Sequence, residues 1–283
     1  MKPRTVTALR LGRIRYLNTV PFYHGLNVPL EESGFDLEWA SGSPAEINRK
    51  MRQGRIDIAP ISSLEYLNHS DQYLLLPGFC IGSRDFSASV LLLSKERVEG
   101  LNGATISLSN ESLSAATLLK ILLKFKFKFK NKFRQQNPNP TEMLSRSNAC
   151  LIIGDEALFY RPKEFVYKSD LSELWWNWSD RPFCFSLWAV RRSYYREHPG
   201  AVIQFCRRLK TNLQNNLADL ERLLREGLGL TLADEKFPTV FGYLFNLSYG
   251  LDPEMQGGLE LFFQLAHRLG FSPRPDKLEF VEI

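Results

Sequence analysis

The chain has 283 residues, enough for one large domain or for two domains of about 150 residues each. Hydrophobic residues make up 44% of it and charged residues 24%, which excludes an intrinsically disordered chain. Lys and Arg number 36 against 31 Asp and Glu, so the net charge is +5. A charge of this size suits an anionic small molecule and is too small to indicate a nucleic-acid partner.

The cysteines and the N-terminal residues restrict the class of protein further. Cys80, Cys150, Cys184 and Cys206 lie far apart, without CxxC spacing or a Cys/His cluster, which excludes a zinc ribbon, a thioredoxin motif and a disulfide-rich scaffold. The opening residues, MKPRTVTALRLGRIRYL, contain no apolar segment or cleavage site of a secretory signal, and no stretch reaches the ~18 apolar residues of a membrane span. We therefore expect a cytoplasmic protein with reduced thiols, no membrane partner and no metal site.

The first part of the chain alternates strand-like and helix-like patterns. We expect strands over residues 6–14, 35–39 and 56–61. Pro21 is placed to begin a helix, and residues 43–46 form a capping box that opens another helix, which ends at Gly54. Residues 62–65 repeat the capping-box pattern. This succession of strand, cap, helix and strand is typical of βαβ units and predicts a largely parallel sheet with helices on both faces.

The middle of the chain begins with two apolar runs, which we expect to be buried strands over residues 87–94 and 104–109. An amphipathic helix follows in the segment NESLSAATLLKILL. Lys124 to Phe133 (KFKFKFKNKF) alternate Lys and Phe with a period of two, which predicts an amphipathic strand with one buried and one solvated face. A strip that binds nucleic acid or lipid is the alternative, and the solvated sheet face is favoured. Residues 135–141 are polar and Pro-rich, as in a loop.

The last part of the chain contains further strand-like segments and a series of helical patterns. We expect a strand and turn over residues 150–155, strands over 185–193 and 278–283, and helices over 199–226, after Leu232 and over 252–269. The strand-like segments near Ser89 and Trp188 bracket the middle of the chain. We therefore predict an α/β fold of two lobes with two interlobe crossings, with residues 1–92 plus 188–283 in lobe I and 93–187 in lobe II. The strand-to-helix turns of both lobes would then face a central cleft.

Standard catalytic motifs are missing: the sequence contains no GxSxG, HExxH, P-loop or GxGxxG. It does contain strand-to-helix turns with small polar groups, whose unpaired N–H groups would form an anion site without Arg or Lys. Simple helix capping explains Ser62 and Asp155 when each is taken alone, so the prediction rests on the turns as a set. The residues of these turns are Asn18, Thr19, Ser62, Ser63, Ser112, Ser114, Gly154 and Asp155.

Several segments, spread over nearly the whole chain, carry a family resemblance. They are RYLNTVPF (15–22), SPAEINRKMRQGRIDIAPISSLEY (43–66), SASVLLLSK (87–95), LIIGDEAL (151–158), DLSELWWNWSDRPFCFSLWAV (170–190) and YGLDPEMQGGLELF (249–262). They closely resemble the chorismate dehydratase family of menaquinone biosynthesis. The resemblance implies a type II periplasmic-binding-protein fold, used as a cytoplasmic enzyme.

The resemblance also implies an activity. Chorismate would lose water, with no cofactor, to give the aromatic enol ether 3-(1-carboxyvinyloxy)benzoate, the first step of the futalosine route. By position, Asn18 and Ser89 resemble the residues closest to the chemistry, and Ser112 and Ser114 resemble the helix start that binds a substrate carboxylate. Two departures stand out. Residues 112–115 lack one hydroxyl of the family's Ser-x-Thr-Ser pattern, and SRDFSA precedes Ser89 where a Gly-containing turn is expected.

Neither Asn nor Ser is a competent general base at neutral pH. Our hypothesis is that a carboxylate of the substrate removes the proton, with Asn18 and Ser89 fixing it and the leaving hydroxyl by hydrogen bonds. Asp155 and Glu65 are rival bases, ranked lower because helix capping explains them. A solute-binding protein without activity and a 1,4-dihydroxy-6-naphthoate synthase are alternative functions. The synthase is expected to carry a Ser-Pro-Cys-Pro-Asn type of motif and a catalytic His, whereas this sequence has RYLNTVPF.

Overall fold

The structure, a computed structural model, describes residues 7–26, 35–162, 166–274 and 277–283. Its strands form two sheets. The first contains, in spatial order, β11 (Leu247–Ser248), β4 (Tyr73–Ser83), β10 (Phe183–Arg191), β3 (Ile58–Ser62), β1 (Thr7–Ile14) and β2 (Phe35–Gly42). The second contains β7 (Lys132–Gln136), β6 (Thr105–Ser109), β8 (Ala149–Ile153), β5 (Val90–Ser94) and β9 (Tyr167–Asp170). Val6, the first residue of the first expected strand, lies outside the described residues.

Helices surround both sheets. Those that follow the strands of the first sheet are α1 (Val20–Tyr23), α3 (Pro44–Arg52), α4 (Ser63–Asn68), α9 (Arg192–Glu197), α10 (Pro199–Ala218), α11 (Leu220–Leu228), α12 (Phe237–Asn246) and α13 (Pro253–Arg268). Those that accompany the second sheet are α5 (Ser114–Ile121), α6 (Pro140–Ser145), α7 (Gly154–Phe159) and α8 (Leu171–Ser179). The capping box at residues 43–46 is confirmed. The helix expected over 199–226 is divided at Asp219, whose side chain caps the second piece.

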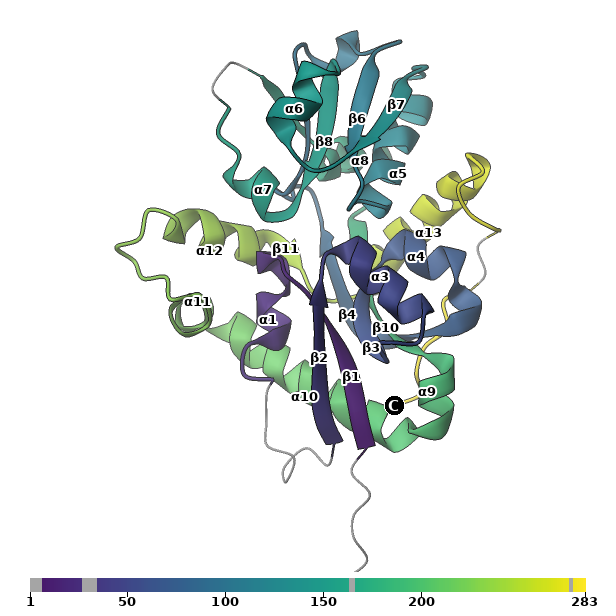
Figure 1. Cartoon of the computed structure of the whole chain (residues 1–283), viewed down its shortest axis with the longest axis vertical. Coiled ribbons are helices and arrows are strands. Elements are labelled where there is room, and N and C mark those ends of the chain that lie inside the picture. The colour runs from purple at the N-terminus through teal and green to yellow at the C-terminus, as the bar shows by residue number, and fades with distance from the viewer. Residues whose placement is uncertain (1–6, 27–34, 163–165, 275–276) are drawn as a thin grey trace, which may run out of the picture.

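The two sheets belong to two lobes that lie one above the other along the long axis of the molecule (Figure 1). The chain crosses between β4 and β5 and returns between α8 and β10. The predicted boundaries, 92/93 and 187/188, would divide β5 and β10, each of which pairs within one sheet, so the sheets place both crossings slightly earlier. The assignment of residues 1–92 plus 188–283 and 93–187 to separate lobes otherwise stays a prediction.

Both sheets are mixed, so the expectation of a largely parallel sheet is only partly right. Strand β1 runs parallel to β2 and β3, as in βαβ units. Strand β10, however, returns from the second lobe and inserts antiparallel between β3 and β4. In the second sheet β6 is parallel to β7 and β8, whereas β5 is antiparallel to β8 and β9. The two crossings therefore account for the antiparallel pairs at β10 and β5.

The segment from Lys124 to Phe133 is not the amphipathic strand predicted from its alternation. Helix α5 continues as a turn of π-helix over Leu122–Lys126, Lys128 has a positive φ of 59°, and β7 begins only at Lys132. The phenylalanines at 125, 127 and 129 are partly buried against the core, and Lys124, Lys128 and Lys130 are exposed. The division into buried and solvated side chains was therefore correct for these six residues but not for Phe133, which is exposed, and the predicted strand was wrong. The strand expected over 278–283 is likewise reduced to a single bridge between Leu75 and Phe280.

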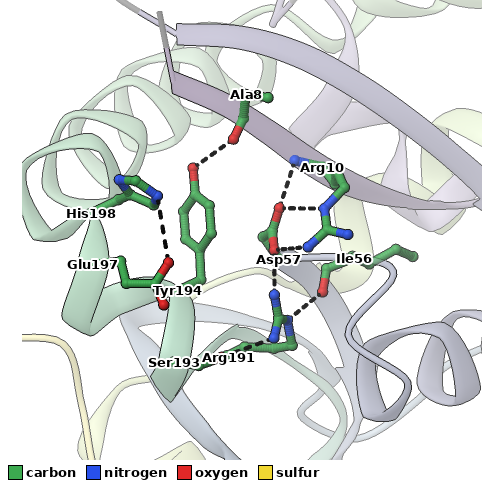
Figure 2. Close-up of polar contacts among 9 residues, drawn as sticks. All are labelled: Ala8, Arg10, Ile56, Asp57, Arg191, Ser193, Tyr194, Glu197 and His198. Atoms are coloured by element: carbon green, nitrogen blue, oxygen red, sulfur yellow. Dashed lines mark hydrogen bonds and ion pairs between the residues drawn. The ribbon is translucent and has the colours of Figure 1, made fainter. Parts of the chain in front are cut away.

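An ion cluster around the buried carboxylate of Asp57 joins strands of the first sheet (Figure 2). Asp57 precedes β3, and its carboxylate accepts hydrogen bonds from Arg10 Nη2 at 2.6 Å and from Arg191 Nη2 at 2.7 Å. Its other oxygen accepts from the Arg10 backbone N–H at 3.0 Å. Nearby, Tyr194 donates to the Ala8 carbonyl at 3.0 Å. The cluster thus links β1, β3 and β10 around one carboxylate that is 1% exposed.

Candidate active site

A cavity lies between the lobes, where the ends of β1, β3 and β8 meet the start of β5. Its empty volume, mouth included, is about 680 Å³. Among the described residues, no Lys, Arg or His lines it, and Glu111 is the sole carboxylate. All predicted site residues except Ser63 and Asp155 line it, namely Asn18, Thr19, Ser62, Ser89, Ser112, Ser114 and Gly154. Their roles in binding or catalysis stay predictions.

Asn18 and Thr19 lie in a 3₁₀ helix, Leu17–Thr19, between β1 and α1. The Thr19 hydroxyl lies 2.9 Å from the Ile14 carbonyl and 2.8 Å from the Tyr16 carbonyl, both of which accept its hydrogen. Thr19 therefore fixes the turn. The Oδ1 atom of Asn18 is buried and has no hydrogen-bond partner within the described chain. A buried amide oxygen without a partner is costly, so this atom is available for a ligand.

Ser89 precedes β5 and is held from several sides. Asp170 accepts hydrogen bonds from the backbone N–H groups of Ser87 at 3.1 Å and of Ala88 at 2.7 Å. The Ser89 carbonyl accepts from the N–H of Gly154 at 2.8 Å. Ala88 has a φ of 58°, in the left-handed region that favours glycine. The turn expected to contain glycine thus exists with alanine in that conformation, stabilised by the buried Asp170 carboxylate.

The three candidate serines of the helix starts differ in what their hydroxyls contact. Ser112 Oγ is buried without a hydrogen-bond partner in the described chain, so it is open to a ligand. Ser114 Oγ accepts from the N–H of Leu64 and lies 3.0 Å from Ser63 Oγ, so it joins α5 to α4 instead. Ser62 Oγ caps α4 and also accepts from Asn48, which leaves its own hydrogen to donate. The hydroxyl of Ser112 is therefore the best candidate of the three to bind a substrate oxygen.

Gly154 opens α7 with a φ of 69° and lies against the ring of Tyr16. A Cβ atom at this position would be 2.8 Å from Cε1 of Tyr16, too close for two carbon atoms. Beyond the ring, the Tyr16 hydroxyl donates to Glu111 Oε2 at 3.0 Å. Burial raises the pKa of Tyr16, and the nearby Glu111 carboxylate raises it further. Through Tyr16, the turn after β1 therefore contacts the residues before α5 and the start of α7, and these contacts close one side of the cleft.

The two rival carboxylates do not line the cavity, and helix capping explains neither. Asp155 Oδ1 accepts from the backbone N–H of Leu17 at 3.0 Å, which joins α7 to the turn that carries Asn18. The N-cap of α7 is Ile153. Burial raises the pKa of Asp155, and the hydrogen bond from Leu17 opposes this. Glu65 is paired with Arg52 and also accepts from Tyr73.

Glu65 lines a different, polar cavity together with Arg52, Asn68 and His69. Burial raises the pKa of Glu65, and the charge of Arg52 opposes this. Glu65 therefore does not line the main cavity, and Asp155 lies just behind its wall.

The sequence analysis did not predict three residues in or next to the cavity, two tyrosines and one glutamate. Tyr16 and Glu111 line the cavity, and Tyr243 lies behind it, with its hydroxyl donating to Ser89 Oγ at 3.0 Å. Tyr16 lies inside the segment RYLN, which was an available signal. Tyr243 lies in an apolar helix with no motif around it. In the described part of the chain, no three His, Cys, Asp or Glu side chains gather in a way that could hold a metal ion.

Comparison with known proteins assigns this architecture to a family. Residues 9–268 match a family model described as menaquinone biosynthesis. The chain belongs to this family. It is 31% identical over 280 residues to the chorismate dehydratase of Thermus thermophilus, and the alignment covers 93% of this chain and 96% of that relative.

Solved structures with the same architecture are more distant in sequence. Protein AF1704 from Archaeoglobus fulgidus matches with a TM-score of 0.66 at 16% identity, over 95% of this chain and 99% of that one. The periplasmic aliphatic sulphonate binding protein SsuA from Escherichia coli matches with a TM-score of 0.66 at 14% identity, over 96% of each chain. These likenesses concern the fold alone, and they confirm the predicted periplasmic-binding-protein architecture. Among the described residues, no helix is both long and apolar enough to span a membrane.

Proposed function

We propose that this protein is a chorismate dehydratase, a lyase that removes water from chorismate to form 3-(1-carboxyvinyloxy)benzoate. The observation that carries the proposal is the interlobe cavity lined by Asn18, Ser89 and Ser112, in a member of a menaquinone biosynthesis family. The resemblance to the Thermus thermophilus chorismate dehydratase over most of the chain supports the same reaction.

The polar groups of the cavity suit a dianion that must be held without a counter-charge in contact. A cation that binds a substrate carboxylate also weakens it as a base, because an opposite charge stabilises the ionised form. Neutral hydroxyl donors hold a carboxylate by hydrogen bonds and leave more of its basicity. Ser62, Ser89 and Ser112 each retain a hydroxyl hydrogen that no described protein acceptor takes.

The reaction is then mainly a problem of orientation. A carboxylate of the substrate takes the proton from the ether-bearing carbon, the bond from the adjacent carbon to its hydroxyl breaks, and the ring becomes aromatic. The departing hydroxide recovers the proton, so that one water leaves and no other reactant is consumed. Asn18 and Ser89 would fix the carboxylate and the leaving hydroxyl. Both residues line the interlobe cavity, which supports these roles.

The test is turnover by purified protein. Added chorismate should disappear and the aromatic enol ether should form, as followed by liquid chromatography with mass detection. Asn18→Ala and Ser89→Ala should each lower kcat by about 100-fold, the usual loss when a positioning group is removed from a reacting centre. Ser94→Ala is the matched control, because Ser94 is a buried serine at the other end of β5 whose hydroxyl bonds the Glu96 carbonyl.

Binding of chorismate without turnover would contradict the proposal and indicate a solute-binding protein. Unchanged kcat in both alanine variants would contradict the roles of Asn18 and Ser89 while leaving the reaction in place. The cytoplasmic location stays a prediction, which fractionation of producing cells would test.

A further inference from the structure

The Tyr243 side chain lies directly behind Ser89 and is not part of the cavity wall. It projects from α12, is 3% exposed, and donates its hydroxyl hydrogen to Ser89 Oγ at 3.0 Å. Burial raises the pKa of Tyr243 above its usual value. The phenol therefore keeps its proton at neutral pH and remains a donor.

The direction of this hydrogen bond decides where the hydrogen of Ser89 points. A serine hydroxyl has one hydrogen to donate and an oxygen that accepts. Because Ser89 Oγ accepts from Tyr243, its own hydrogen must be directed to another acceptor. Within the described chain no protein acceptor for it is found, and Ser89 lines the cavity. The remaining acceptor is whatever occupies the cavity.

We propose that Tyr243 is a positioning residue that turns the hydroxyl of Ser89 into the cavity as a hydrogen-bond donor to the substrate. The inference rests on the proposed function and adds to it a residue that does not touch the substrate. Without the phenol hydroxyl, Ser89 is free to rotate and to donate to other acceptors near its turn. In part of the enzyme–substrate complexes the Ser89 hydroxyl would then point away from the substrate, which lowers kcat more than the affinity for substrate.

The variant that tests this is Tyr243→Phe, which removes one oxygen and keeps the ring packing. We expect kcat to fall by about 10-fold or more, with KM changed less than threefold, since a misaligned donor typically costs one to two orders of magnitude. Tyr249→Phe is the matched control. Tyr249 is 5% exposed, belongs to the same apolar cluster, and its hydroxyl has no hydrogen-bond partner within the described residues. This control should keep the wild-type kcat.

A double-mutant cycle separates positioning from a general effect on packing. If Tyr243 acts through Ser89, then Tyr243→Phe should lower kcat in the wild type and have no further effect in Ser89→Ala. Equal losses in both backgrounds would overturn the proposal, because the phenol would then act independently of Ser89. Thermal unfolding of each variant, together with the activity of Tyr249→Phe, detects a loss that comes from misfolding.

The outcomes distinguish this inference from the function on which it rests. If the wild type converts chorismate and Tyr243→Phe is fully active, the positioning role is wrong and the function stands. If the wild type does not convert chorismate, the proposed function fails and the positioning role fails with it.

Discussion

Asp155 lies behind the wall of the candidate cavity, and its contacts argue for a structural role. Its Oδ1 atom accepts the N–H of Leu17, one residue before Asn18. This hydrogen bond fixes the position of the Asn18 turn relative to α7 of the second lobe. A base in the same position would instead need a clear path to the substrate proton, and Asp155 does not line the cavity.

Replacement of Asp155 distinguishes the two roles. An Asn side chain at 155 still offers an oxygen to Leu17, so Asp155→Asn should lower kcat less than 10-fold, whereas Asp155→Ala should lose the hydrogen bond and be more impaired. Burial raises the pKa of Asp155, so an Asp155 base would make the wild-type rate rise with pH through that raised value. We expect no such rise. The measurement is kcat of the wild type and of both variants from pH 4 to pH 8. A 100-fold or larger loss of kcat in Asp155→Asn would disprove the structural role.

At the residue scale, the sequence predicted which residues line the cavity better than it predicted their contacts. Asn18, Ser89 and Ser112 were found because turns and the family resemblance mark them. The capping pattern at residues 62–65 correctly predicted that Ser62 Oγ accepts a hydrogen bond from the Glu65 N–H. The Glu65 side chain, however, pairs with Arg52 instead of completing the box. Tyr243 could not be found, because its contact with Ser89 spans 154 positions and depends on how α12 packs.

The start of α7 shows how one element closes the cleft. Gly154 combines a positive φ with the close approach of the Tyr16 ring, so both the backbone and the space require glycine. Gly103 offers a matched comparison, since its φ is 78° and nothing lies within 4 Å of the position of a Cβ. The two glycines separate backbone strain from steric contact.

We expect Gly103→Ala to lower the free energy of unfolding by about 1 kcal/mol, the usual cost of a left-handed alanine, and to leave kcat and KM unchanged. Gly154→Ala should cost more and should also raise KM, because the added methyl pushes Tyr16 away from Glu111. Denaturant unfolding and steady-state kinetics measure both effects. If the two variants behave alike in both measurements, then the approach of Tyr16 to Gly154 does not matter for the cleft.

The segment from Lys124 to Phe133 explains why element boundaries are harder to predict than exposure. Its alternating pattern is typical of a strand. The preceding helix nevertheless continues as a turn of π-helix over Leu122–Lys126, and the chain leaves the helical conformation only after it. Phe127 and Phe129 stack with ring centroids 5.4 Å apart, and both pack on the core. Packing of these rings, rather than the period of the sequence, determines the backbone there.

At the scale of the whole molecule, the Asp57 cluster joins the strands of the first sheet (Figure 2). Burial alone would raise the pKa of Asp57, but hydrogen bonds from Arg10 and Arg191 outweigh it, so the pKa lies below its usual value. A carboxylate with a lowered pKa contributes stability above its unfolded-state pKa of about 3.9 and loses it as the pH falls through the folded-state value.

We therefore expect Asp57→Asn to lower the free energy of unfolding at pH 7 by about 2 to 3 kcal/mol, less than for a fully buried pair because Arg10 is partly exposed. The gap from the wild type should shrink as the pH falls below about 4. Glu142→Gln is the control, since its pair with Arg146 is exposed and worth little. Denaturant unfolding at pH 7 and pH 3 checks this, and a gap that does not narrow at pH 3 would refute the role of Asp57.

The two-lobe arrangement was predictable because two long strand-like segments bracket the middle of the chain. The direction of the strands was not, since patterns along a chain indicate which residues are buried and not which strands become neighbours. Strand β10 illustrates this: its apolar sequence predicted a strand, and only the folded chain reveals that it pairs with both β3 and β4.

That position of β10 has a consequence for how the protein is made. A ribosome releases β3 and β4 long before β10, so the first sheet has an empty central place until residues 183–191 have emerged. The second sheet has no such gap, because all its strands come from the unbroken stretch between Val90 and Asp170. Residues synthesised late are thus needed to complete the sheet that begins first. During synthesis the second sheet can therefore be completed before the first sheet.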